Sequence, residues 1–194
     1  MSSVPKDEIF DKYLQKAISE TNELGDEIAR AAGDAVPVMG SGHPLADVFL
    51  LKPVPQPAEI QEGVAFYGRS GQAILKSLQR LHVDPMAIYG TNCLKFAGGD
   101  EDEAKPWLVR EIHIVQPKLF VVMGEPALEF LNELEFPLSQ TLQAEPGTLQ
   151  RFTPTIEALH TPDIDDSLDE QPAKTRFWNA FKALGPWWAE LPPY

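Results

Sequence analysis

Apolar residues recur along this chain at spacings that change from one segment to the next. From residue 7 to residue 32 they return every three or four positions, which is the period of an amphipathic helix. We therefore predict one long helix over residues 7–32, ended by Gly33-Asp34. Its apolar positions are Ile9, Phe10, Tyr13, Leu14, Ala17, Ile18, Leu24 and Ile28.

Shorter apolar runs without that period predict strands. Residues 46–51 and 118–123 are nearly continuous apolar runs, which are typical of strands buried on both faces of a parallel sheet. Alternating elements of this kind favour an α/β fold of three layers, α/β/α, with a central four-stranded parallel sheet. The other predicted strands are residues 87–91 and 155–159, and the other predicted helices are residues 72–81, 104–115, 127–134 and 174–184.

The length and composition indicate one domain. A chain of 194 residues with 43% hydrophobic content is long enough for a substantial core. We expect a single domain over residues 1–194, with its core at about 36–184 and the helix of 7–32 ahead of it. No segment reaches the roughly eighteen apolar residues of a membrane span, and the first residues lack the apolar stretch of a signal peptide. The expectation is a soluble, cytoplasmic protein without membrane contact.

The chain contains one cysteine, Cys93. One thiol cannot form an intramolecular disulfide or supply a cysteine-rich metal site, and it fits a reducing compartment. We therefore expect no metal ion and no other cofactor, and in particular no iron–sulfur cluster.

The net charge of -13 argues against tight binding of DNA. Phosphate contacts dominate affinity for nucleic acids, so an acidic protein needs a local positive face to bind them. The sixteen Lys and Arg residues are scattered singly, and no basic run is present. A folded surface can still gather lysines that are distant in sequence.

Candidate site residues lie where predicted strands end, which is where α/β sheets bind ligands. The first strand runs into the loop Lys52-Pro53-Val54-Pro55-Gln56 and then passes an isolated Phe66. Asn92 follows the second strand, and His160 follows the fourth. Together these residues predict a site for a small planar ligand. Each also has a purely structural explanation, as a core aromatic, a turn residue bonded to its own backbone, or a structural histidine.

Residues 46–71 resemble, without a gap, the segment that carries the first active-site motif in family 4 of the uracil-DNA glycosylase superfamily. In that family the loop reads Gly-Glu-Ala-Pro-Gly, and its acid assists attack of water on the glycosidic bond. The same positions here read Lys52-Pro53-Val54-Pro55-Gln56, so Pro53 stands in place of the acid. The resemblance covers roughly residues 24–184 and implies the fold of that family.

The resemblance also implies roles for three residues. Phe66 would stack on the base, and the Asn92 amide, with one acceptor and two donors, would read the O4 and N3 edge of uracil. His160 would stabilise negative charge on the departing base. In the family this histidine is usually followed at once by proline, whereas here Thr161 intervenes. Phe96 and Ala104 stand where the family has cysteines that bind an iron–sulfur cluster.

Other features of the chain depart from an active glycosylase. Pro53, Pro55 and Pro57 have no N–H to offer a base or a water molecule. Glu59 is the better candidate for a substitute acid, and its alternative is an ordinary surface carboxylate. Residues 163–170, which in active relatives form the loop that enters the duplex as a base is flipped out, contain five acids in eight positions and would meet phosphate repulsion.

Two functions remain in view from the sequence. The first is a DNA-repair enzyme that hydrolyses the N-glycosidic bond of a damaged base such as uracil, with DNA as its partner. The second is a catalytically inactive member of the same fold that binds a free base, a nucleotide or a protein. Residues 186–194, which contain two tryptophans, are a candidate contact surface for a protein partner and otherwise pack onto the core.

Overall fold

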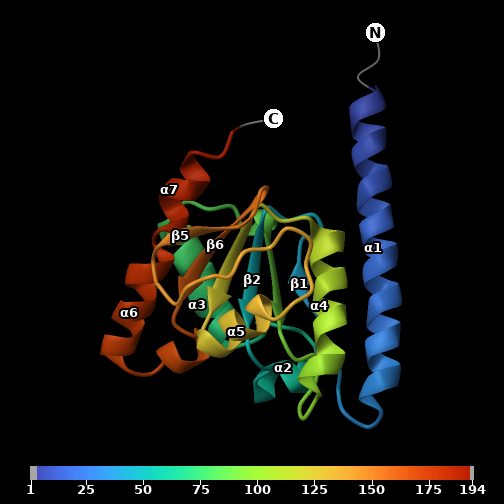
Figure 1. Ribbon diagram of the computed structural model, residues 1–194, viewed down its shortest axis with the longest axis horizontal. Coiled ribbons are helices and arrows are strands. Elements are labelled where there is room, and N and C mark those ends of the chain that lie inside the picture. Colours follow the sequence, from blue (N-terminus) through green and yellow to red (C-terminus); the bar gives the residue numbers. More distant parts are fainter. Residues whose placement is uncertain (1–3, 193–194) are drawn as a thin grey trace.

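The computed structural model describes residues 4–192, so the last two residues of the candidate contact surface at 186–194 lie outside the described part. A six-stranded sheet runs through the domain in the order β1-β3-β2-β4-β6-β5 (Figure 1). Its four central strands are parallel, which confirms the predicted fold class. They are β3 (Ile88–Asn92), β2 (Val48–Lys52), β4 (Leu119–Met123) and β6 (Ile156–Thr161).

Two antiparallel strands that the sequence pattern did not predict close the edges of the sheet. They are β1 (Ser41–Gly42), which pairs with β3, and β5 (Leu149–Thr153), which pairs with β6. The first has only two residues, and the second has exposed or half-exposed side chains over its first three. Neither therefore shows the apolar run by which the central strands are recognised.

Helices cover both faces of the sheet and form the outer two layers (Figure 1). Three helices pack on one face: α1 (Val4–Ala32), α4 (Glu101–Val115) and α5 (Glu125–Asn132). Three pack on the other: α3 (Arg69–Arg80), α6 (Gln171–Phe181) and α7 (Leu184–Ala189). A short helix, α2 (Pro57–Glu62), follows β2, and the 3-10 turns are η1 (Pro85–Ala87) and η2 (Asp165–Ser167).

Side chains of the central strands alternate between two hydrophobic clusters, as the two-residue period of a strand requires. In β2, Val48 and Leu50 pack toward α3 and α6, while Phe49 and Leu51 pack toward α4. All four are essentially inaccessible to solvent. The same alternation carried forward places Lys52, the last residue of β2, on the α3 side.

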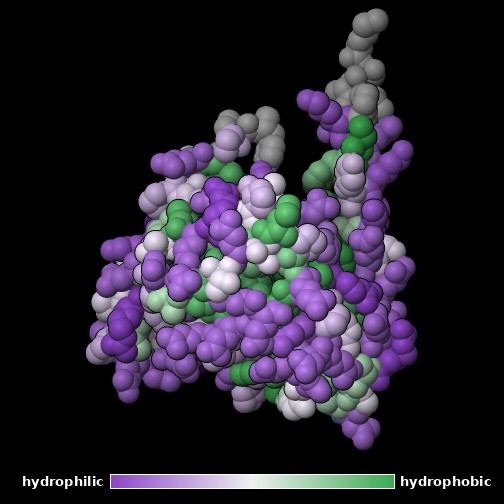
Figure 2. All heavy atoms as spheres, viewed as in Figure 1, coloured by the Kyte–Doolittle hydropathy of each residue, from purple (hydrophilic) through white to green (hydrophobic). Residues whose placement is uncertain are grey.

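The long helix α1 packs along α4 through its C-terminal half and projects beyond the domain through its N-terminal half (Figure 1). Leu24 and Ile28 are buried against the domain. The same stripe continues into the projecting half, where Ile9 and Phe10 are 51% exposed and Tyr13 is 61% exposed. Figure 2 shows the resulting apolar surface on this part of α1. Within the described residues, no helix is both long enough and apolar enough to cross a bilayer.

Candidate functional site

A buried lysine lies at the carboxyl end of β2. The Lys52 side chain is 0% exposed, and its ammonium lies 2.7 Å from Glu59 Oε2. The ammonium also donates to the Val54 carbonyl at 3.0 Å. Asp165 Oδ2, from the loop after β6, lies 3.0 Å away without hydrogen-bond alignment, so we treat that contact as electrostatic. Two hydrogen-bond acceptors and one further carboxylate thus surround this ammonium.

Glu59 is the carboxylate that organises this end of the sheet. Its predicted alternative, an ordinary surface carboxylate, is wrong, because the side chain is fully buried on α2. Beyond the Lys52 contact, Oε2 accepts the Gln56 N–H at 2.8 Å, and Oε1 accepts the Phe66 N–H at 2.7 Å. Oε1 also accepts the Asn92 side-chain N–H at 3.2 Å. Charge-assisted bonds of this kind are the strong ones, so Glu59 fixes β3, α2 and the Phe66 turn relative to one another.

The rest of the loop predicted as the first motif is partly buried and is bonded to the neighbouring strand end. Pro53 is buried, and its carbonyl accepts the Leu94 N–H at 3.2 Å. Val54 is 42% exposed and Pro55 is half-buried. Gln56 begins α2, where Pro57 occupies the first helical position and needs no N–H.

Phe66 adopts a backbone conformation with φ of 60°, which is uncommon for a residue other than glycine. Its N–H bond to Glu59 holds the turn, and two glycines make room for it. A Cβ on Gly71 would lie 1.9 Å from the Phe66 carbonyl oxygen, and a Cβ on Gly90 would lie 2.6 Å from its ring. The Lys52 ammonium lies 5.4 Å from the ring centroid, within the range of a cation–π interaction.

Asn92 ends β3 directly beside Lys52 in the parallel register. Its side chain is fully buried and is reached by no solvent. The amide nitrogen is bound to Glu59, while Oδ1 has no hydrogen-bond partner among the described residues. Lys52, Glu59, Phe66 and Asn92 therefore form one cluster, which we call the Lys52 cluster.

His160 does not join the Lys52 cluster. It lies within β6 opposite Val122, and its strand neighbour Ala158 packs toward the α4 and α5 side of the sheet. Thr161 is the residue of β6 that shares a face with Leu159 and Met123, on the α3 side. Phe66, Asn92 and His160 therefore do not converge on one pocket.

The chemistry of His160 is set by a backbone carbonyl. Its Nδ1 lies 3.1 Å from the Val122 oxygen, which can only accept, so Nδ1 carries the proton. Burial lowers the pKa of His160 below its ordinary value, although the Val122 bond opposes the shift. The neutral ring then offers Nε2 as an acceptor, whereas a departing base anion requires a donor.

Two separate cavities flank the predicted residues. One of about 180 Å³ lies beside Phe66 and is lined by Leu50, Ile74 and Gly90. The other, of about 300 Å³, lies beside His160 and is lined by Gly124, Asp163 and Asp166 among others. Neither is lined by Asn92.

The acidic loop after β6 is partly folded into the domain. Ile164 is 2% exposed, and Asp163 Oδ1 accepts the Asp165 N–H at 2.9 Å. Burial, together with the charges of Asp165 and Asp166, raises the pKa of Asp163 to about 6. Burial also raises the pKa of Asp165, although Lys52 opposes that shift. Asp163 and Asp165 are therefore half-buried, and only the later acids of the loop are exposed.

A second buried ion pair lies on the opposite face of the sheet. Lys95 pairs with Glu111 of α4, and its ammonium also donates to Thr91 Oγ1 and the Asn92 carbonyl, both at 2.7 Å. The Tyr89 hydroxyl donates to Glu111 at 2.5 Å, and burial raises the pKa of that hydroxyl well above its usual range. Sequence reasoning placed Lys52 in the candidate loop but did not foresee that Lys52 and Lys95 are buried, since lysine is almost never fully buried unless paired.

The positions that correspond to cluster cysteines hold apolar packing instead. Phe96 and Ala104 are buried in the core, and the Phe96 ring lies 6.1 Å from that of Trp107. These side chains carry no group that could bind iron, so they do not fit an iron–sulfur cluster. Over the described residues, no group of three or more His, Cys, Asp or Glu side chains is placed to hold a metal ion.

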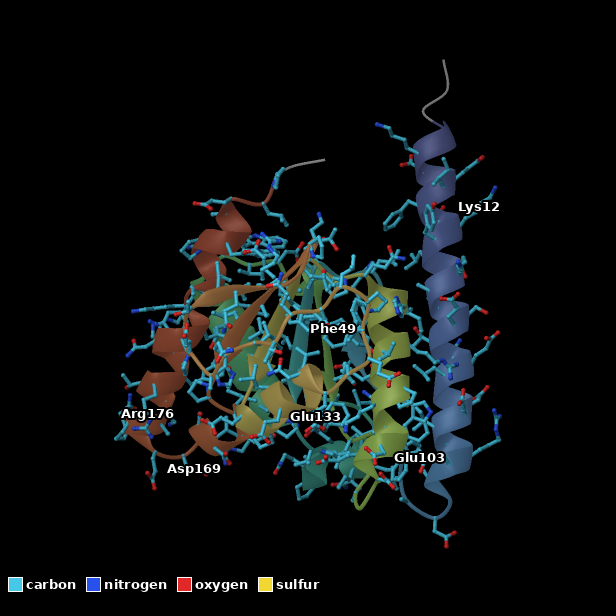
Figure 3. All side chains as sticks on the ribbon, viewed as in Figure 1. Lys12, Phe49, Glu103, Glu133, Asp169 and Arg176 are labelled. Carbon is cyan, nitrogen blue, oxygen red and sulfur yellow. The ribbon has the colours of Figure 1, made fainter. Side chains whose placement is uncertain are left out.

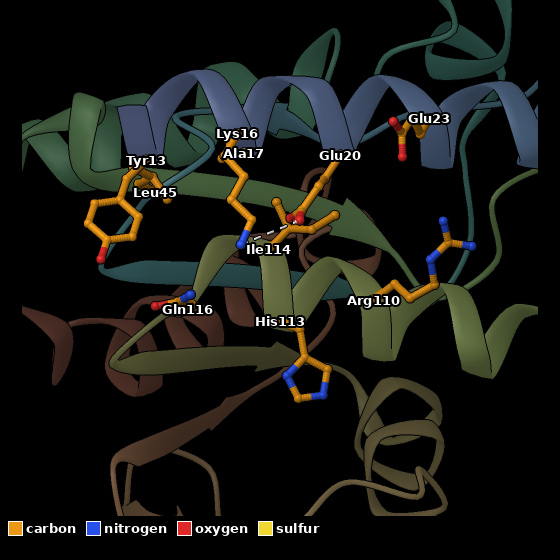
Figure 4. Close-up of a pocket in the computed structure, with 10 residues that line it drawn as sticks. All are labelled: Tyr13, Lys16, Ala17, Glu20, Glu23, Leu45, Arg110, His113, Ile114 and Gln116. Carbon is orange, nitrogen blue, oxygen red and sulfur yellow. Dashed lines mark ion pairs between the residues drawn. The ribbon is translucent and has the colours of Figure 1, made fainter. Parts of the chain in front are cut away.

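Larger cavities lie away from all of these residues. One of about 480 Å³ separates α1 from α4 and is lined by Tyr13, Lys16, Glu20 and Arg110, among others (Figure 4). Another of about 490 Å³ is lined by residues of α4 and of the segments around Phe136 and Pro154. Neither contains a residue of the predicted site, so their size alone does not identify them as functional.

The sheet order and the polar cluster at its carboxyl edge define an α/β protein. Proteins of this class bind ligands where the parallel strands end. A family model described as the uracil DNA glycosylase superfamily matches residues 39–183, which is most of the chain. The chain therefore belongs to the uracil-DNA glycosylase superfamily.

Among curated proteins, the chain is similar to a type-4 uracil-DNA glycosylase of Sulfurisphaera tokodaii. The two are 28% identical over 107 residues, a stretch that covers 50% of this chain and 48% of the relative. The match thus spans about half the length of that relative.

Proposed function

We propose that this chain is a member of the superfamily that does not hydrolyse a glycosidic bond. It acts by binding a partner, without catalysis. The observation that carries the proposal is the buried Lys52 ammonium, 2.7 Å from Glu59 and 5.4 Å from the Phe66 ring. The resemblance assigns the space against that ring to the base. In this protein the ammonium takes up part of that space.

Admitting a base would require Lys52 to leave the site. Breaking a buried ion pair by removing one partner costs about 3–5 kcal/mol, because the remaining charge is uncompensated. A base that had to displace Lys52 would thus bind at least about 100-fold more weakly than in an open site. Asn92 would also have to become accessible, since it is now fully buried.

The groups needed for bond cleavage support the same proposal. Pro53 offers no carboxylate to activate water, and Glu59 has its oxygens occupied by Lys52 and by the N–H groups of its neighbours. The neutral tautomer of His160 offers an acceptor where a leaving base needs a donor.

One observation favours the alternative, excision of a base after the loop opens. Asn92 Oδ1 is buried and has no partner among the described residues, and an unsatisfied acceptor of this kind is costly. The N3–H of uracil would satisfy it. In this case the Lys52 side chain would leave the site when a base enters.

An excision assay separates the two functions. We expect no abasic sites in uracil-containing single-stranded or duplex DNA even with stoichiometric protein. Product that appears with the unaltered chain and disappears with Asn92→Ala would contradict the proposal. Product that persists in Asn92→Ala comes either from a contaminating enzyme or from cleavage that does not need Asn92. The assay is therefore repeated with protein purified from a host that lacks uracil-DNA glycosylase activity, where any remaining product also contradicts the proposal.

A further inference from the structure

The N-terminal half of α1 presents apolar side chains to solvent. Phe10 is 51% exposed and Tyr13 is 61% exposed, in a segment that projects beyond the domain (Figure 1). Helices in proteins owe most of their stability to the packing of an amphipathic face, so an apolar face left exposed indicates an interaction site. We propose that a second copy of the chain docks on this face, with its α1 antiparallel to that of the first copy.

Five positions form one seam along this face, which we call the α1 seam. They follow one another at spacings of four, three, four and three, which is the repeat by which two helices pack together. The seam begins with a cation and ends with an anion, and apolar side chains lie between them. Its residues are Lys6, Phe10, Tyr13, Ala17 and Glu20. Antiparallel pairing therefore sets each cation against an anion, whereas parallel pairing would set like charges together.

A two-fold axis at the middle of the α1 seam fixes which side chains meet across the pair. Because an interface of this symmetry uses the same surface on both copies, each contact forms twice. Lys6 of one copy lies opposite Glu20 of the other. Phe10 lies opposite Ala17, so a large ring meets a small side chain. Within one chain, Glu20 makes an exposed contact with Lys16 at 3.9 Å, which contributes little and can be shared with Lys6 of the second copy.

The domain leaves space where Phe10 of the second copy would lie. The cavity of about 480 Å³ between α1 and α4 is lined by Tyr13, Ala17 and Glu20, among others (Figure 4). These are the seam residues nearest the packed half of α1, so the cavity continues the exposed face toward the domain. The ring of the incoming Phe10 fits against Ala17 in this space. Its burial supplies the main apolar contact of the dimer, as aromatic side chains commonly do at interfaces.

The extent of the contact predicts a weak dimer. Stable interfaces bury about 800 Å² on each partner. Each copy contributes two partly exposed aromatic rings, and a whole aromatic side chain buries about 150–250 Å². The contact is thus smaller than the usual interface, and we expect a dissociation constant on the order of 100 μM. The inference goes beyond the proposed function and does not rest on it, because the α1 seam contains no member of the Lys52 cluster.

Sedimentation equilibrium of the full chain tests the inference at protein concentrations from about 10 to 500 μM, on both sides of the expected dissociation constant. The mass of the unaltered chain should rise from that of a 21.5 kDa monomer toward twice that value. Phe10→Ala should raise the dissociation constant at least about tenfold, since it removes the ring that fills the cavity. Alanine favours helix, so this loss would not come from unfolding of α1.

Exchange of the two charges tests the antiparallel arrangement. Lys6→Glu should raise the dissociation constant about 5- to 30-fold, because it sets like charges against each other at both ends of the pair. Lys6→Glu combined with Glu20→Lys should bring the constant back to within about threefold of the unaltered chain, since the two sites then attract again. The matched control is Lys12→Glu, the same change of charge on the side of α1 turned away from the domain (Figure 3), and it should leave association unchanged.

Three outcomes would overturn the inference. A monomer at every concentration would leave this face of α1 for a different protein. Equal losses in Lys6→Glu and Lys12→Glu would show an effect of net charge alone. A double variant that associates no better than Lys6→Glu would exclude antiparallel pairing of the α1 seam. Circular dichroism checks that each variant remains folded, and since none of them alters the Lys52 cluster, failure here leaves the proposal on catalysis untouched.

Discussion

A lysine at the end of a buried strand decides how the carboxyl end of β2 is arranged. Lys52 has three donors, and Glu59, Val54 and Asp165 surround them. Two of these donors are used in hydrogen bonds, to Glu59 and to the Val54 carbonyl, and the Asp165 carboxylate lies against the third side of the ammonium. The same contacts also fix the Phe66 turn, since Glu59 accepts the N–H of Phe66. Lys52 therefore helps to fix the Phe66 turn through Glu59.

Asp163, beside this site, should make stability depend on pH. Its pKa is raised from 3.8 to about 6 by burial, so between these values the folded protein binds more protons than the unfolded chain. Ionised Asp163 thus destabilises the fold, and its contribution to stability falls as the pH rises from about 4 to 6. Asp163→Asn should be more stable than the unaltered chain above pH 6, by about 1–2 kcal/mol once partial exposure is allowed for. Below about pH 4 the difference should vanish.

Urea unfolding across this range of pH measures the effect. Asp26→Asn, on the exposed face of α1, is the matched control and should stay within about 0.5 kcal/mol of the unaltered chain throughout. A difference between Asp163→Asn and the unaltered chain that is constant with pH would show that Asp163 does not titrate in this way.

Among the elements, α1 combines a packed half and a projecting half. Ile28 is 0% exposed in the core, whereas Ile9 is 51% exposed on the same helix. Both are isoleucines in helical backbone, so the same substitution at each separates packing from helix propensity. Ile9 is therefore the control position for Ile28 within the same helix.

Ile28→Ala should cost about 2–4 kcal/mol of unfolding free energy, because it leaves a cavity between α1 and the domain. Ile9→Ala should cost less than about 0.5 kcal/mol. Urea unfolding measures both. Equal costs would mean that α1 does not pack as described, and an insensitive Ile28→Ala would mean that α1 folds separately from the domain.

The apolar pattern predicted the four central strands and the five longer helices, because packing on both faces of a sheet leaves a strong periodic signal. It missed α2, which has six residues and begins among prolines. It also ended the fourth strand at residue 159, whereas β6 continues to Thr161. Adjacent strand residues point to opposite faces, so this boundary decides whether His160 or Thr161 lies on the same face of the sheet as Asn92. A single sequence without its strand register cannot settle that point.

The sequence predicted only part of the Lys52 cluster, and the reason is different. Glu59 and Asn92 were identified from loop position and strand end, but the ion pair between Lys52 and Glu59 joins β2 to α2. Such pairing depends on tertiary structure. The one available signal was that Lys52 directly follows a continuous apolar run, where a surface lysine is not expected.

For the whole molecule, membership of the superfamily fixes the fold and leaves the activity to the site. The net charge of -13 argues against nucleic acid, but it does not describe local order, such as Lys6 and Glu20 at opposite ends of the α1 seam. Distribution of charge, rather than its sum, sets which ligands the surface attracts.

Titration of the ¹⁵N-labelled protein with uracil tests whether Lys52 closes the base site. The signals to follow are the Asn92 side-chain amide and the Phe66 backbone amide, both of which are bound to Glu59. With the site filled, neither signal should move as uracil is added to millimolar concentration. A saturable shift of both signals would show that the base enters beside Phe66 and Asn92, and it would contradict the closed site.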